Sequence, residues 1–111
     1  MIPQLIGTKK TAAYRRCERF FKERSINFQS RDPFQKPLSP QELDSIAQRC
    51  GGYDALIDRE GPRFAKRGLQ WIEFDPGEEL REDPQLLRLP ILRSDHGTWI
   101  DPNEEELKTL A

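Results

Sequence analysis

Residues 2–31, IPQLIGTKKTAAYRRCERFFKERSINFQSR, decide the fold of this chain. A short apolar run over residues 2–6 ends at Gly7, which is typical of a strand followed by a turn. From Thr11 onward, apolar side chains recur at helical spacing along one face. Residues 26–31 then alternate in a way that predicts a second strand. A strand, a helix and a strand in this order predict a parallel crossover unit.

The remaining sequence predicts short helices, then a hairpin and a closing helix. Ser39-Pro40-Gln41-Glu42 is a capping box with proline in the first helical position. Asp83-Pro84 starts another short helix by the same logic. Residues 91–100 indicate two strands around a turn at residues 94–97. Asp101-Pro102 is the expected cap of the last helix.

The length of 111 residues predicts one domain spanning residues 1–111, large enough to bury a core. No apolar run approaches the roughly 20 residues of a membrane span, so we expect no membrane partner. Two cysteines exclude a disulfide-rich scaffold and a four-cysteine zinc site. A single histidine argues against a histidine-based metal site.

The net charge of −1 hides an uneven distribution along the chain. Residues 1–31 carry eight Lys/Arg and two Asp/Glu, whereas residues 73–111 carry four Lys/Arg and eleven Asp/Glu. The overall balance argues against direct nucleic-acid binding. A balanced total charge is still compatible with one local anion site in the basic first third of the chain.

Four segments, in the right order, resemble the ArsC/Spx/YffB family of arsenate reductases and glutaredoxin-like proteins. This resemblance implies an α/β, thioredoxin-like fold, with a βαβ unit, a helical insertion and a ββα unit around a mixed central sheet. It runs nearly end to end. The segments are GTKKT at residues 7–11, LSPQEL at residues 38–43, ALI at residues 55–57 followed by Gly61, and DPQLLRLP at residues 83–90.

The resemblance also implies chemistry from which this sequence departs. Family reductases place a thiolate at the start of the first helix and hold the oxyanion with arginines, one of them directly before a proline. The cysteine position is Thr11 here, and the position before the proline is Leu89. The other arginine position falls on Glu60 in the YffB register or on Asp58 in the ArsC register. We therefore assign no catalytic residue.

A retained anion pocket remains a candidate site. Lys9, Lys10 and Thr11 precede a helix N-terminus, which favours anions. The alternative is that the lysines are solvated and the threonine only caps the helix. Arg59 and Arg88 lie one residue from the family's arginine positions, and they could compensate only if the backbone presents them differently. The resemblance implies that Pro90 is cis and shapes the floor of the site.

The two cysteines have a structural and a functional interpretation. Cys17 and Cys50 both lie on apolar helix faces, which predicts inert core thiols. Cys17 is also the only replacement nucleophile that the first helix offers. A disulfide between the two thiols is not expected, because a cytosolic setting disfavours it.

Several surface features have open interpretations. Trp71 and Trp99 are expected to contribute partly to the core, and residues 58–68 to be irregular or weakly helical. A basic cluster on the first helix is either a solvated face or a docking surface for an acidic partner. Its members are Arg15, Arg16, Arg19, Lys22 and Arg24.

The resulting hypothesis is a family member without the thiol chemistry, acting as a non-catalytic binding or regulatory module. Its expected partner is a protein, RNA polymerase by analogy with Spx, or a small anion. No cofactor is expected, and the cytoplasm is the expected location. The alternative is a glutathione-dependent reductase or oxyanion-handling enzyme that uses the first-helix pocket. Spx-type redox sensing cannot be carried over, because the chain lacks a Cys-x-x-Cys motif.

Overall fold

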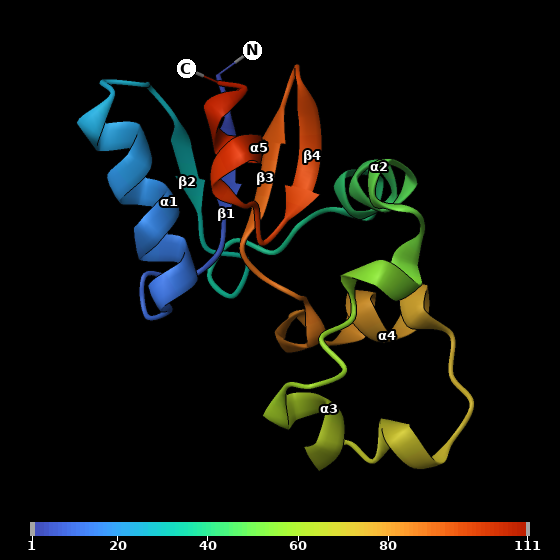
Figure 1. The fold of residues 1–111 in the computed structure, drawn as a ribbon. Helices are drawn as coiled ribbons and strands as arrows, with labels where there is room; N and C mark the ends of the chain where they lie inside the picture. Colours follow the sequence, from blue (N-terminus) through green and yellow to red (C-terminus); the bar gives the residue numbers. More distant parts are fainter. Residues whose placement is uncertain (1, 111) are drawn as a thin grey trace. The chain divides into compact units, whose positions relative to one another are not determined.

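The computed structural model describes residues 2–110 and divides the chain into two compact units. The sheet unit comprises the residues up to Lys36 and those from Leu89 onward, and the helical unit is Pro37–Arg88. The helical unit is therefore inserted in sequence between the two halves of the sheet unit, as expected (Figure 1). The expectation of one domain over the whole length stays a prediction.

The sheet unit contains a four-stranded mixed sheet in the order β2-β1-β3-β4. β1 is parallel to β2 and antiparallel to β3, and β3 is antiparallel to β4. The predicted parallel crossover, mixed sheet and hairpin are thus confirmed. The second strand is shorter than predicted, because Ile26 N donates to Phe21 O at 2.9 Å and so closes the end of α1. The strands are β1 Gln4–Ile6, β2 Gln29–Arg31, β3 Ile91–Ser94 and β4 Gly97–Ile100.

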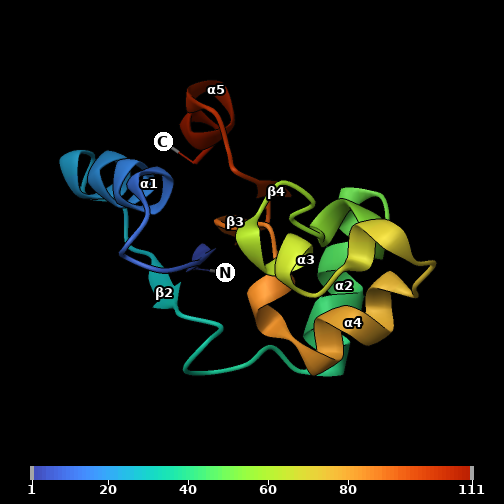
Figure 2. The same ribbon diagram turned by 90° about the horizontal axis from the view of Figure 1, so that it is seen from below.

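Two helices, α1 (Ala12–Glu23) and α5 (Glu104–Lys108), lie on one face of this sheet (Figure 2). Their apolar side chains bury a cluster against the inward-facing residues of β1 and β3. Trp99 packs against this cluster and is partly buried, as expected. The buried members are Leu5, Tyr14, Cys17, Phe20, Phe21, Leu92 and Leu107.

The cap of α5 differs from the prediction. Asn103 Oδ1, not Asp101, accepts a hydrogen bond from Glu106 N at 2.8 Å, and Asn103 N donates one to Glu106 Oε1 at 2.9 Å. This reciprocal capping box satisfies two backbone N–H groups at once, so the helix starts two residues later. Asp101 instead takes a positive φ of 48° in the turn that leads into the helix.

The helical unit consists of short helices joined by single 3-10 turns (Figure 1). The capping box between Ser39 and Glu42 is confirmed, and Gly51 ends the helix in the left-handed conformation. The backbone groups of residues 56–58 and 86–88 exchange hydrogen bonds of 2.7 and 2.8 Å, which tie the two segments together. The elements are α2 Pro40–Cys50, η1 Tyr53–Leu56, α3 Pro62–Lys66, η2 Leu69–Trp71, α4 Pro76–Glu82 and η3 Pro84–Leu86.

Two expectations for the helical unit were wrong or incomplete. Trp71 is 82% exposed and contributes nothing to the core. Helix α4 was not predicted, although Asp75 accepts hydrogen bonds from Gly77 N at 2.9 Å and Glu78 N at 3.4 Å. Asp75-Pro76 is the same cap-plus-proline signal that was used to predict the helix after Asp83. The signal was therefore present in the sequence.

Candidate functional site

Thr11 occupies the N-cap of α1, as predicted, and its hydroxyl is fully used there. Oγ1 accepts a hydrogen bond from Tyr14 N at 3.3 Å and donates one to Thr8 O at 3.2 Å. The group at the family's cysteine position thus stabilises the turn and the first helical N–H groups. A neutral hydroxyl cannot act as a thiolate does, and its proton is already hydrogen-bonded to the carbonyl oxygen of Thr8.

The loop before α1 is held close to two buried residues. Gly7 N donates to Arg31 O at 2.9 Å, which continues the pairing of β1 with β2. A Cβ at Gly7 would lie 2.8 Å from the Tyr14 ring and 3.3 Å from Pro90 Cβ. Glycine is therefore required for the close approach. The Leu89–Pro90 bond is cis, as the resemblance implied, and Pro90 is buried.

A hollow of about 330 Å³ lies beside this loop in the sheet unit. The exposed Lys9 and Lys10 supply two positive charges to it, and Asp32 supplies one negative charge. The structure thus places the two candidate lysines together next to the α1 N-terminus. Anion binding there remains a prediction. The lining residues are Gly7, Thr8, Lys9, Lys10, Tyr14, Ser30, Asp32 and Gln35.

The helical unit brings together the candidate residues Asp58, Arg59, Glu60 and Arg88 around a separate hollow of about 390 Å³. Asp54 also lines this hollow, so three carboxylates face two guanidinium groups. The excess of negative charge opposes oxyanion binding.

Arg59 is already engaged within the helical unit. Its guanidinium forms an ion pair with Asp54 and lies 5.6 Å from the Phe64 ring and 5.4 Å from the Phe74 ring. These contacts hold the side chain among its own neighbours. An incoming oxyanion would have to compete with Asp54 for it. Arg88 is exposed, and Leu89 carries no charge at the position before the proline.

A second ion network in the helical unit was missed by the sequence reasoning. Arg63 Nε lies 2.6 Å from Asp83 Oδ2, and Arg67 contacts the same oxygen at 3.4 Å and Glu79 at 2.5 Å. Burial of Asp83 alone would raise its pKa, but hydrogen bonds from Arg63 and Gln85 and the nearby positive charges lower the pKa overall. The network joins α3 to the start of η3. No local motif signals it, because its partners are far apart in sequence.

Neither cysteine has the properties of a reactive thiol. Cys17 is fully buried in the core cluster, and burial raises its pKa to about 11. Cys50 is partly buried, and burial raises its pKa as well. A raised pKa leaves the thiol protonated near neutral pH, where only the thiolate is nucleophilic. Both cysteines are free thiols, and no disulfide between them was expected from the sequence.

Metal and membrane sites receive no support from the described residues. Within residues 2–110, no group of three or more His, Cys, Asp or Glu side chains is placed to hold a metal ion. None of the helices in that range is both long and apolar enough to cross a membrane.

Comparison with known proteins finds Spx regulators among the sequence relatives of this chain. No family model matches the chain. The global transcriptional regulator Spx 2 of Lactococcus lactis subsp. lactis is 30% identical over 90 residues, which cover 77% of this chain and 67% of that protein. The global transcriptional regulator Spx of Bacillus subtilis is 29% identical over 99 residues, covering 85% of this chain and 75% of the relative.

Solved structures agree on the fold. An ArsC family related protein from Bacteroides fragilis superposes with a TM-score of 0.85 at 14% identity, covering 100% of this chain and 98% of the other. At this identity the likeness shows the fold alone. It confirms the predicted thioredoxin-like arrangement of a βαβ unit, a helical insertion and a ββα unit.

Proposed function

Because the chain belongs to the ArsC/Spx family of thioredoxin-like proteins, we propose that it is a non-catalytic member that regulates transcription by binding RNA polymerase. In this role the fold presents a protein-binding surface and carries out no thiol chemistry. The proposal joins two observations, the names of the sequence relatives and the state of the family's cysteine position.

The single observation that carries the proposal is the N-cap role of Thr11. Its hydroxyl accepts from Tyr14 N and donates to Thr8 O, so the residue is built into the turn. Reduction of an oxyanion by this family requires a sulfur that forms covalent adducts. The buried Cys17 does not replace it, because its pKa of about 11 leaves roughly one thiol in ten thousand ionised at pH 7.

The proposal gains further support from charge. Asp54, Asp58 and Glu60 dominate the hollow in which the family's oxyanion-holding arginine is expected. A chain under pressure to bind arsenate would favour positive charge there. The relatives at 30% and 29% identity are named global transcriptional regulators, which favours a regulatory role over a metabolic one.

The proposal is tested by binding the full chain to purified bacterial RNA polymerase core enzyme, measured by biolayer interferometry. We expect saturable binding that is unchanged by dithiothreitol or diamide, because residues 11–14 read Thr-Ala-Ala-Tyr and hold no redox switch. Binding that requires oxidation, or no binding to the polymerase, contradicts the proposal. An unrelated thioredoxin-fold protein of similar charge serves as the control.

A second candidate function is a glutathione-dependent reductase or another oxyanion-handling enzyme. The hollow beside Lys9 and Lys10 favours it, because two lysines and a helix N-terminus attract anions. An arsenate reductase assay with glutathione and glutaredoxin separates the candidates. The regulatory proposal expects no turnover, whereas turnover abolished by Cys17→Ser would support the enzyme.

A further inference from the structure

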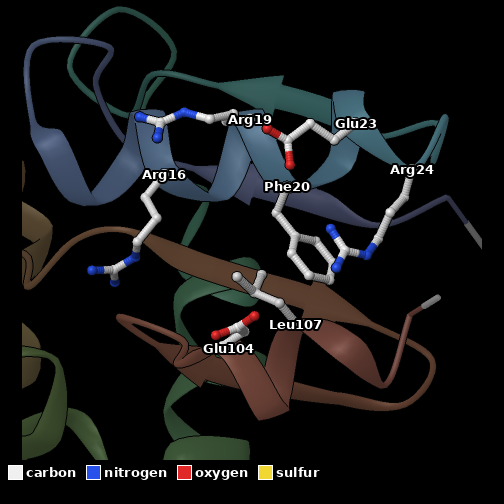
Figure 3. Close-up of a pocket in the computed structure, with 7 residues that line it drawn as sticks. All are labelled: Arg16, Arg19, Phe20, Glu23, Arg24, Glu104 and Leu107. Atoms are coloured by element: carbon white, nitrogen blue, oxygen red, sulfur yellow. The ribbon is translucent and has the colours of Figure 1, made fainter.

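A groove runs between α1 and α5 in the sheet unit (Figure 3). Its volume is about 270 Å³. Helix α1 and its C-cap residue supply three arginines, and α5 supplies one acidic and one apolar side chain. The lining residues are Arg16, Arg19, Phe20, Glu23, Arg24, Glu104 and Leu107.

The spacing of the α1 residues makes the groove a continuous feature. Positions 16, 20 and 24 are four residues apart, and so are positions 19 and 23, so the two rows run side by side along the helix. Eight residues of helix span about 12 Å, which matches about four residues of an extended peptide. The apolar residues Phe20 and Leu107 are 7% and 2% exposed and form the floor.

The arginines that line the groove contact neighbouring side chains but keep N–H groups that a ligand can use. Arg24 stacks on the Phe20 ring, with its central carbon 3.8 Å from the ring centroid. Stacking uses the flat face of the guanidinium, so the N–H groups at its edge remain available to a carboxylate. Arg16 contacts Asp101 at 3.3 Å on an exposed surface. Among the described residues, Arg19 has no carboxylate within ion-pair distance.

The two acids in the groove do not cancel this charge. Glu104 lies 3.9 Å from Lys108, its neighbour one turn along α5. Three arginines against Glu23 and Glu104 leave the lining with a net positive charge. A bound ligand therefore gains by placing carboxylates near Arg19 and Arg24 and avoiding Glu23.

We infer that this groove binds a short acidic peptide segment of a protein partner, with carboxylates on Arg19 and Arg24 and an apolar side chain on the floor beside Phe20 and Leu107. The inference rests on the proposed function, since it names the surface and the chemistry by which a regulatory partner is recognised. Of the two interpretations of the basic cluster, the inference takes the docking surface for the residues that line the groove; Lys22 does not line it.

The test uses a fluorescein-labelled synthetic peptide of glutamates around one central leucine, bound to the full chain and followed by fluorescence anisotropy. Combined Arg19→Ala and Arg24→Ala substitutions should weaken binding about fivefold. Glu23→Ala should strengthen it about twofold, because it removes a like charge. Lys22→Ala removes the same charge from the same helix without lining the groove, so it should leave binding nearly unchanged.

Two-dimensional NMR spectra locate the bound peptide. We expect shifts confined to α1 and α5 and weakened by added salt. Shifts centred on Lys9 and Lys10, equal losses in the Lys22 and arginine variants, or no saturable binding would overturn the inference. Circular dichroism confirms that each variant is folded.

The polymerase experiment keeps this inference separate from the proposed function. If the variant with both arginines replaced still binds the polymerase, the groove is not the surface that recognises this partner. The regulatory proposal would then stand. If the peptide binds at the groove but the chain does not bind the polymerase, the regulatory proposal is contradicted. The groove would still be supported as a binding site for acidic peptides.

Discussion

The ion pairs of the helical unit and the α1 groove of the sheet unit engage their arginines differently. In the helical unit, Arg59, Arg63 and Arg67 each contact a carboxylate of the same unit. In the sheet unit, Arg19 has no such partner among the described residues, and Arg24 rests on an aromatic ring. The first set stabilises short helices, whereas the second leaves hydrogen-bond donors facing solvent.

This difference separates structural charge from available charge. The helical unit is built from short helices, so ion pairs that join its segments help to fix them. In the sheet unit, the apolar cluster beneath α1 holds this helix against the sheet. The resemblance points to arginine positions that hold Glu60 or Asp58 and Leu89 here, whereas Arg19 and Arg24 lie along the groove beside α1.

The largest expected effect tests whether the start of α1 still favours a negative charge. Thr11→Cys places a thiol at the N-cap, next to Lys9 and Lys10, where helix N-termini lower the pKa to about 7.5 or below. Burial holds Cys17 at about 11. We therefore expect the introduced thiol to react with iodoacetamide at pH 7 roughly a thousandfold faster than Cys17.

Peptide mapping by mass spectrometry measures each thiol separately, so Cys17 and Cys50 serve as internal references. A rate at the introduced thiol similar to that of Cys50 would mean that this end of α1 has lost its positive potential. The positive charge that remains available to a ligand in the sheet unit would then be limited to the arginines of the groove.

The next effect tests the buried ion network of the helical unit. Asp83→Ala removes the carboxylate that contacts Arg63 and Arg67 and accepts from Gln85 N at 3.2 Å. We expect the free energy of unfolding to fall by about 2 kcal/mol, because buried charged partners lose their hydrogen bonds. Urea denaturation measures it.

Asp54→Ala is the matched control, since it also removes a carboxylate from an arginine of the helical unit. The Asp54 side chain is 67% exposed, so the loss should stay within about 0.5 kcal/mol. Equal losses in the two variants would show that burial does not distinguish the two ion pairs.

The pH dependence of stability follows from the same carboxylate. The pKa of Asp83 is lower in the folded protein than its usual value, so its ionised form stabilises the fold. This contribution is fully present above the unfolded pKa of about 3.9 and is lost as the pH falls through the folded pKa. The difference in unfolding free energy between wild type and Asp83→Asn should be constant from about pH 5 to 7 and shrink below about pH 4. A difference that grows on acidification would contradict the assignment.

The smallest effect concerns the cap of α1. Thr11→Ala leaves Tyr14 N without its acceptor and should cost about 1 kcal/mol in urea denaturation. Thr11→Ser keeps the acceptor and should restore most of the stability. Unchanged stability in the alanine variant would mean that the hydroxyl has no structural role and is free for another one.

Local signals predicted much of the fold. The caps at Thr11 and Ser39 depend on residues three positions away, so the sequence alone shows them. The same rule applies to Asp75-Pro76, so the sequence also carries the signal for the start of α4. Asp101-Pro102 predicts a cap at Asp101, but the reciprocal bonds between Asn103 and Glu106 start the helix later.

Features that depend on distant residues could not be predicted. Arg63 and Asp83 are separated by 20 positions, and no periodic pattern links them. The engagement of Arg59 by Asp54 and two phenylalanine rings depends on how the helical unit folds back on itself. Similarly, α5 completes the groove only because the chain returns to the face that α1 covers.

Gly7 has a consequence for how such chains are identified. Any side chain at this position would collide with the Tyr14 ring and approach Pro90, whatever residue stands at position 11. The requirement for glycine therefore comes from the shape of this turn and is independent of the residue at position 11. A sequence search that rewards this glycine and the proline detects the turn, and it carries no information on whether a thiol stands at position 11.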